Sequence, residues 1–162
     1  MPHNWRKSER HFEINGKNIT LKNLILINGK YGEGGALHIN SKSKCNLINV
    51  KISGNEGTKG GGVYTEGELV CKDCMFSHNE AKNYGGAINI DDTSAHVVIK
   101  NSFKGNTVDK DGEGSIIYNY GHFDKISNNY YGTNNPDWKN ALYEHKYFGL
   151  DVEHRDSNHV RL

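Results

Sequence analysis

The stretch Ile52-Ser-Gly-Asn55 is followed, six positions after the Asn, by Gly61-Gly62-Val63-Tyr64, and both of these motifs recur along the chain. The first motif, a hydrophobic residue three positions before an Asn, returns as Phe76-Ser-His-Asn79, Phe103-Lys-Gly-Asn106 and Ile126-Ser-Asn-Asn129. The second motif, two small residues before an apolar pair, returns at Ala36-Leu37, Ala87-Ile88 and Ile116-Ile117. The Asn-to-Asn steps are 24, 27 and 23 residues. Self-similarity at such a period is typical of a solenoid.

The distance between the two motifs shows how one coil is built. From Asn55 to Val63 and from Asn79 to Ala87 there are 8 residues, whereas the way back to the next Asn varies between 13 and 19. One corner is therefore stacked, and the other tolerates insertion. A first copy lies in residues 21–29, where either Asn28 or Gly29 takes the Asn position. The strand aligns better with Gly29, and the turn leaves both open.

Composition narrows the class of protein. The chain of 162 residues contains 19 Gly and only 2 Pro, and its formal charge is +1. Frequent Gly and Asn indicate many tight turns. The near-balanced charge argues against nucleic-acid binding. No apolar run is long enough to insert in a membrane, and the N-terminal residues lack the apolar segment of a signal peptide.

These patterns predict an all-β fold, a right-handed, single-stranded parallel β-helix of about five coils of 23–27 residues. The repeat domain covers residues 12–138, and residues 1–11 and 139–162 are tails or caps. An uncapped end exposes unpaired strand edges, so end-to-end self-association is expected.

Stacking the coils assigns residues to columns. One inward column contains Leu26, Ile52, Phe76, Phe103 and Ile126, and a second contains Leu21, Leu47, Cys71 and Val98. A third contains Leu37, Tyr64, Ile88 and Ile117, which leaves Ala36, Val63 and Ala87 on the outer face. The Asn column is expected to form a ladder of side-chain amides. A positive φ or a close approach between stacked corners is expected at Gly34, Gly61, Gly85 and Gly114.

The repeats resemble those of adhesin-like surface proteins of methanogenic archaea, and are similar to those of chlamydial polymorphic outer-membrane proteins. The resemblance rests on FEINGKNITLKNLILING (12–29), LINVKISGN (47–55), DCMFSHN (73–79) and NNYYGTNNPD (128–137). It implies a parallel β-helix at the cell surface or outside the cell, with a role in adhesion and no catalytic residues. The chain would be part of a larger exported protein and would bind glycans or cell-surface proteins without a cofactor.

A polysaccharide hydrolase or lyase on the same fold is the competing hypothesis, and a purely structural spacer is another. Such an enzyme needs paired acids and a nearby His. The chain offers Asp91, Asp92 and His122, but its arginines lie outside the repeat.

Two further motifs suggest metals. Cys71 and Cys74 have the spacing of half a zinc site, but a second pair of ligands is missing, so burial in the core is the better interpretation. The acidic loop with Asp109, Asp111 and Glu113 is a weak calcium candidate that lacks most EF-hand positions.

A ligand is expected on the variable half of each coil. The corner between the Asn and Gly motifs is too regular to specify a partner, whereas the loops at residues 41–44, 65–68 and 91–95 differ between coils. Beside these loops, His38, Thr65, Asn89 and Tyr118 are predicted to form one exposed row that contacts the ligand.

Overall fold

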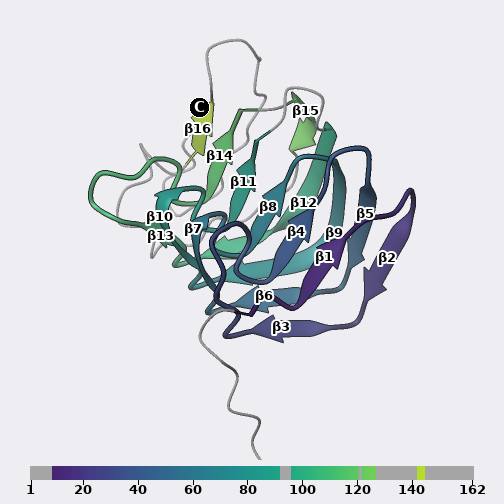
Figure 1. The fold of residues 1–162 in the computed structure, drawn as a ribbon, viewed down its shortest axis with the longest axis horizontal. Coiled ribbons are helices and arrows are strands. Elements are labelled where there is room, and N and C mark those ends of the chain that lie inside the picture. The colour runs from purple at the N-terminus through teal and green to yellow at the C-terminus, as the bar shows by residue number, and fades with distance from the viewer. Residues whose placement is uncertain (1–8, 92–95, 121, 127–141, 145–162) are drawn as a thin grey trace, which may run out of the picture.

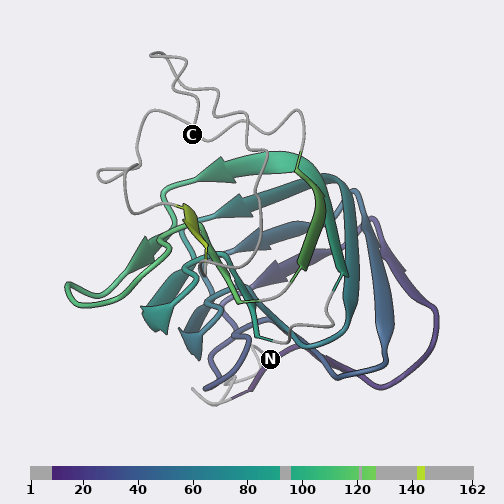
Figure 2. The same cartoon turned by 90° about the horizontal axis from the view of Figure 1, so that it is seen from above.

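The computed structural model describes residues 9–91, 96–120, 122–126 and 142–144, which form a parallel β-solenoid of about four turns. Successive turns lie side by side in Figure 1, and Figure 2 shows the same coils from above. This confirms the predicted all-β parallel solenoid, and the predicted right hand stays a prediction. The described residues contain no helix, and so none that is long and apolar enough to cross a membrane.

Each turn passes through three parallel sheets. Sheet A contains β1 (Phe12–Ile14), β4 (Leu37–Ile39), β8 (Val63–Thr65), β11 (Ile88–Ile90), β14 (Ile117–Asn119) and β16 (Leu142–Glu144). Sheet B contains β2 (Ile19–Lys22), β5 (Lys44–Ile48), β9 (Glu68–Ser77), β12 (His96–Lys104) and β15 (His122–Ile126). In the same sheet β6 (Lys51–Ser53) pairs with β9, and β3 (Ile25–Ile27) pairs with β6. Sheet C contains β7 (Glu56–Lys59), β10 (Glu80–Tyr84) and β13 (Thr107–Val108). The last strand of sheet A, β16, lies beyond the boundary predicted at residue 138.

The inward column before the Asn position is confirmed over the first four turns. Leu26 pairs with Ile52, Ile52 with Phe76, and Phe76 with Phe103, and all four side chains are buried. The two Phe rings stack with centroids 5.1 Å apart. This column is the centre of a core from which water is excluded.

The Asn column forms the predicted ladder. Asn55 donates from Nδ2 to Oδ1 of Asn79, and Asn79 donates likewise to Asn106, each at 2.9 Å. All three side chains are fully buried. In the first turn the amide N–H of Gly29 donates to Oδ1 of Asn55 at 2.8 Å, so Gly29 and not Asn28 takes the ladder position. Asn129 lies outside the described residues.

The predicted alignment of the second turn in sheet A is wrong by one residue. Val63 pairs with Leu37 and Ile88, which places Tyr64 beside His38 and Asn89. The run of three glycines at residues 60–62 permits two alignments, and the structure selects the one in which Gly60, not Gly61, has the positive φ. The extra residue of the third turn is taken up by a bulge within β10. Positive φ values at Gly34, Gly85 and Gly114 are confirmed.

Both apolar columns of sheet A are inside. Ala36, Val63 and Ala87, predicted on the outer face, are fully buried members of the core. The carbonyl of Ala36 accepts hydrogen bonds from two successive amides of the preceding turn, as at a β-bulge, and this irregularity interrupts the alternation that the prediction assumed.

Two predicted members of the sheet B columns are also displaced. Ile99, not Val98, pairs with Cys71, and Ile126 pairs with Ile99 instead of continuing the Phe103 column. The displacement of Val98 follows from a shortened fourth turn. One residue separates Lys100 from Ser102, where the third turn has two residues between Lys72 and Met75.

Candidate functional site

The row predicted to contact a ligand is buried in the structure. Three of its members, His38, Asn89 and Tyr118, occupy one column together with Tyr64, but they are only 7%, 0% and 9% exposed. Thr65 belongs to a different column, opposite Ile39 and Ile90, and is fully buried. The prediction of one exposed row is therefore wrong, while a role for these residues in binding stays a prediction.

Ion pairs and hydrogen bonds between turns hold this part of sheet A. The Tyr64 hydroxyl donates to Oδ2 of Asp91 at 2.6 Å, and Lys59 approaches the same oxygen at 3.8 Å. His38 Nε2 lies 3.0 Å from the carboxylate of Glu66. Burial and the hydrogen bond to Asp91 raise the pKa of the Tyr64 phenol well above its usual value. This phenol therefore stays protonated and acts as a donor that fixes Asp91.

The residues of the hydrolase hypothesis are only partly described. Asp91 follows β11 and is held by Tyr64 and Lys59, whereas Asp92 lies outside the described residues. His122 begins β15, whose backbone pairs with β12 at His96.

The acidic loop after β13 does not assemble a metal site. Within the described ranges, no three His, Cys, Asp or Glu side chains are grouped so that they could hold a metal ion, and Asp109, Asp111 and Glu113 fall within those ranges. The backbone amide of Gly112 donates to the carbonyl of Asp109 at 2.8 Å, which closes a turn.

The three cysteines lie in the core as free thiols, as expected for Cys71 and Cys74. Cys71 pairs with Leu47, and Cys74 donates to the carbonyls of Lys72 and Leu47 at 3.4 and 3.5 Å. Burial raises the pKa of Cys45 to about 12, and a hydrogen bond from Cys71 lowers the pKa of Cys74.

Thiol reagents are expected to label all three cysteines slowly in the native protein, because the thiols are buried. Cys45 is also almost entirely protonated at neutral pH, and only the thiolate reacts. A chromogenic disulfide reagent should react with the native protein at least tenfold more slowly than with the protein in denaturant. Rapid labelling of the native protein would contradict the assignment of Cys71 and Cys74 to the core.

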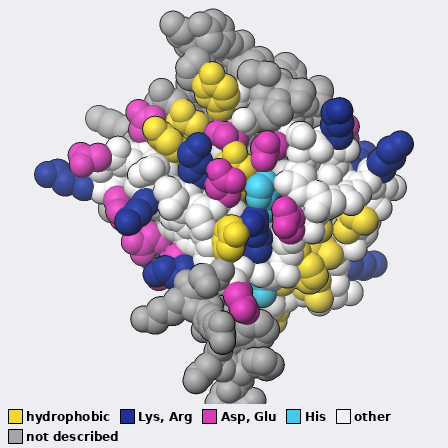
Figure 3. Space-filling view, viewed as in Figure 1, with side chains coloured by type: hydrophobic (Ala, Val, Ile, Leu, Met, Phe, Trp, Pro, Cys, Tyr) yellow, Lys and Arg dark blue, Asp and Glu magenta, His cyan; other side chains and the backbone are white. Residues whose placement is uncertain are grey.

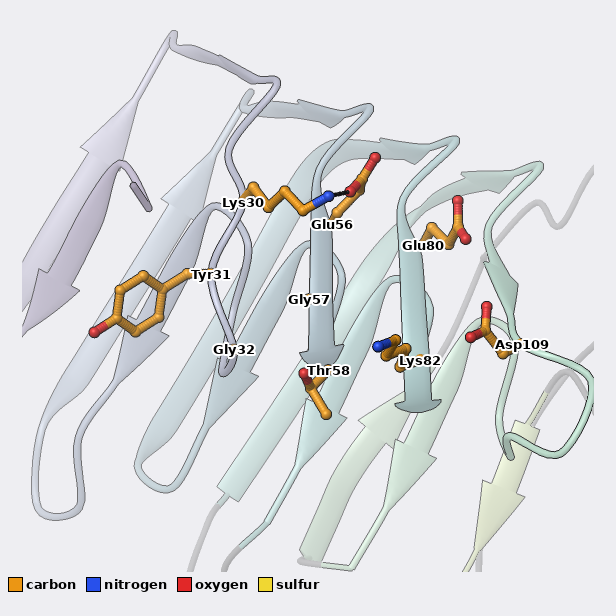
Figure 4. Close-up of a pocket in the computed structure, with 9 residues that line it drawn as sticks. All are labelled: Lys30, Tyr31, Gly32, Glu56, Gly57, Thr58, Glu80, Lys82 and Asp109. Atoms are coloured by element: carbon orange, nitrogen blue, oxygen red, sulfur yellow. Dashed lines mark ion pairs between the residues drawn. The ribbon is translucent and has the colours of Figure 1, made fainter. Parts of the chain in front are cut away.

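A groove of about 510 Å³ opens on the outer face of sheet C and crosses four turns (Figure 4). The first turn contributes Lys30 and Tyr31, the second Glu56 and Thr58, the third Glu80 and Lys82, and the fourth Asp109. At one end, the Arg10 guanidinium lies 3.9 Å from the centroid of the Tyr31 ring and orients it.

The groove presents two rows of polar side chains. Lys30, Glu56 and Glu80 are register partners in successive turns, and Lys30 forms an ion pair with Glu56. Two residues further along each turn lie Thr58, Lys82 and Asp109, the second row. Neighbouring turns of a parallel sheet lie about 4.8 Å apart, so the first row repeats at that spacing along the solenoid. The second row crosses the bulge of β10 between Ala81 and Tyr84.

Sequence reasoning placed the ligand on the other half of the coil and missed this groove. The residues were nevertheless visible as the first and third positions after each ladder residue, in Asn55-Glu-Gly-Thr58, Asn79-Glu-Ala-Lys82 and Asn106-Thr-Val-Asp109. The constant length of this corner does not imply constant side chains. The backbone is regular there, but the side chains that project from it differ from turn to turn.

Fold and groove together define a parallel β-solenoid with a polar groove along one of its sheets. Comparisons of the chain with family models, with curated proteins and with solved structures give no match. The function must therefore be argued from the groove itself.

Proposed function

We propose that this protein is an adhesin-like, non-catalytic binding module of the cell surface that holds a glycan chain in the groove of sheet C. The observation that carries the proposal is the groove, which runs across four turns and is lined by carboxylates, ammonium groups and hydroxyls. The resemblance of the repeats to surface adhesins supports the location.

The chemistry of the two rows suits a hydroxyl-rich chain. Carboxylates accept hydrogen bonds, ammonium groups donate them, and a sugar hydroxyl does both. Tyr31, which is 44% exposed, adds an aromatic ring with an apolar body and a polar tip at one end.

An extended peptide fits these rows less well. Side chains on one face of an extended strand recur roughly every 6.8 Å, whereas the first row of the groove recurs at about 4.8 Å. The side chains of a peptide lying along the groove would therefore be out of register with the groove residues after one or two turns.

Charge favours neutral or amino-bearing glycans. Three carboxylates, from Glu56, Glu80 and Asp109, face two ammonium groups, and one of these, Lys30, is already paired with Glu56. A uronate or sulfate would meet this excess of carboxylate, and like charges in close contact repel. The non-catalytic part of the proposal is supported by Asp91, whose carboxylate is held by Tyr64 and Lys59.

A glycan array with a matched pair of variants tests the proposal. Glu80→Ala with Lys82→Ala removes one carboxylate and one ammonium group from the groove. Lys44→Ala with Glu68→Ala makes the same change in composition at an ion pair on sheet B. The groove variant should bind at least tenfold more weakly, and the sheet B variant should bind as the native protein does. Both should melt within a few degrees of it, since these side chains are exposed.

Binding to no glycan, or equal binding by the groove variant and the native protein, would overturn the proposal. Release of reducing sugar that is abolished by Asp91→Asn would instead favour the polysaccharide hydrolase.

A further inference from the structure

The formal charge of +1 conceals two halves of opposite charge. The four segments that run along sheet B, residues 17–28, 42–54, 68–78 and 96–105, contain eight lysines and two carboxylates, a formal charge of +6. The four segments along sheets C and A, residues 29–41, 55–67, 79–91 and 106–120, contain four lysines and eight carboxylates, a formal charge of −4. In Figure 3, acidic side chains gather over the middle and left, on sheets A and C, and few lie on the right.

The outer face of sheet B combines lysines with exposed aliphatic side chains. Its residues, here called the lysine face, are Lys22, Ile25, Ile27, Lys51, Lys72, Met75 and Lys104, all of them exposed. Lys51 lies between Ile25 and Met75 in adjacent strands, and Lys22 and Lys72 lie on either side of Ile48. Ile25, Ile27 and Met75 are 68%, 47% and 46% exposed.

The lysines of this face are not neutralised by neighbours in the described part of the chain. The two carboxylates of these segments are Glu68, which pairs with Lys44 at 3.6 Å, and Asp73, which lies at the bend of β9. Lys22, Lys51, Lys72 and Lys104 form no ion pair with a described carboxylate. Exposed aliphatic side chains and unpaired cations on the outer face of one sheet call for an occupant that has both anionic and apolar groups.

We infer that the lysine face docks onto the surface of an anionic lipid bilayer. Ammonium groups are attracted to anionic headgroups, and aliphatic side chains between them reach the boundary with the acyl chains. A soluble polyanion would match the lysines but would gain nothing from Ile25 and Ile27.

Docking through sheet B leaves the groove accessible. Sheets B and C form different sides of the solenoid, and Figure 2 shows β7 and β10 away from the broad strands of sheet B. The inference goes beyond glycan binding and does not depend on it.

Co-sedimentation with vesicles tests the docking. The native protein should sediment with phosphatidylcholine vesicles that contain phosphatidylglycerol and stay in solution with pure phosphatidylcholine, and added salt should weaken the binding. Lys51→Gln and Lys72→Gln should each lower the partition coefficient by about fivefold. Lys82→Gln and Lys110→Gln, which change the net charge equally on the acidic half, should leave it unchanged.

A second pair of variants separates a bilayer from other occupants. Ile25→Ser with Ile27→Ser should weaken binding to the anionic vesicles several-fold and leave binding to dextran sulfate unchanged. Unchanged vesicle binding in this variant would show a polyanion site instead. Equal sedimentation of the Lys51 and Lys82 variants, or a dimer in light scattering that Lys51→Gln dissociates, would also overturn the inference.

Discussion

Replacing Gly86 with alanine is expected to lower the free energy of unfolding by at least about 4 kcal/mol, enough to threaten the native fold. A Cβ at this position would overlap the backbone carbonyl oxygens of Ser115 and Thr107 in the next turn. Both obstacles are backbone atoms of a stacked turn, so they cannot move aside as the end of a flexible side chain could. The whole corner between sheets C and A would have to separate.

The loss should appear in urea unfolding followed by circular dichroism. Gly32→Ala is the control, because a Cβ at Gly32 meets no atom within 4 Å. Its effect should stay within about 1 kcal/mol, since the substitution mainly restricts the unfolded chain. Equal unfolding midpoints for the two variants would mean that the turns do not stack as closely as described.

Asn79→Ala should cost about 3–4 kcal/mol, because this amide is the centre of the ladder. Its Oδ1 accepts from the side chain and the backbone N–H of Asn55, at 2.9 and 3.1 Å. Its Nδ2 donates to Oδ1 of Asn106 and to the carbonyl of Ile52, at 2.9 and 3.0 Å. Alanine removes all four bonds, but Nδ2 of Asn55 still donates to the carbonyl of Leu26, and Oδ1 of Asn106 still accepts from the backbone N–H of residue 79. The losses fall on the backbone N–H of Asn55 and the carbonyl of Ile52, at about 1–3 kcal/mol for each group that water cannot reach.

Thermal unfolding of Asn79→Ala beside Asn46→Ala measures this difference. Asn46 also bonds to an Asn of the neighbouring turn, Asn18, at 3.0 Å, but that pair is exposed to water. Its loss should change the free energy of unfolding by no more than about 0.5 kcal/mol. A small loss at Asn79 would show that water replaces the amide inside the corner.

The alignment of neighbouring turns could be predicted only at positions where the residue type fits a single site in the coil. Two examples are the ladder of Asn55, Asn79 and Asn106 and the buried column from Leu26 to Phe103. A large apolar residue three positions before an amide can be buried together with that amide in only one alignment of the coil. Glycine carries no such information. Gly60, Gly61 and Gly62 are interchangeable by type, so the register of the second turn was decided by which peptide carbonyls they meet in the next turn.

Exposure in sheet A depended on neighbours that are distant in sequence. His38, Asn89 and Tyr118 lie at alternate positions to the core residues, which by strand periodicity points them outward. They are buried because long side chains of adjacent turns cover them, such as Tyr64 against His38 and Tyr84 against Tyr118, with ring centroids 4.8 and 4.5 Å apart.

The solenoid, its Asn ladder and the burial of Cys71 and Cys74 could be predicted from sequence alone. Each follows from a side chain whose size or polarity suits a single place in a repeating coil. The choice of Gly29 over Asn28 in the first turn, the groove and the two charged halves required the tertiary structure. A groove is formed by residues about 25 apart in sequence that become neighbours through stacking, as Glu56 and Glu80 do. The side chains that line it can vary without disturbing the backbone register, so the repeat carries no mark of them.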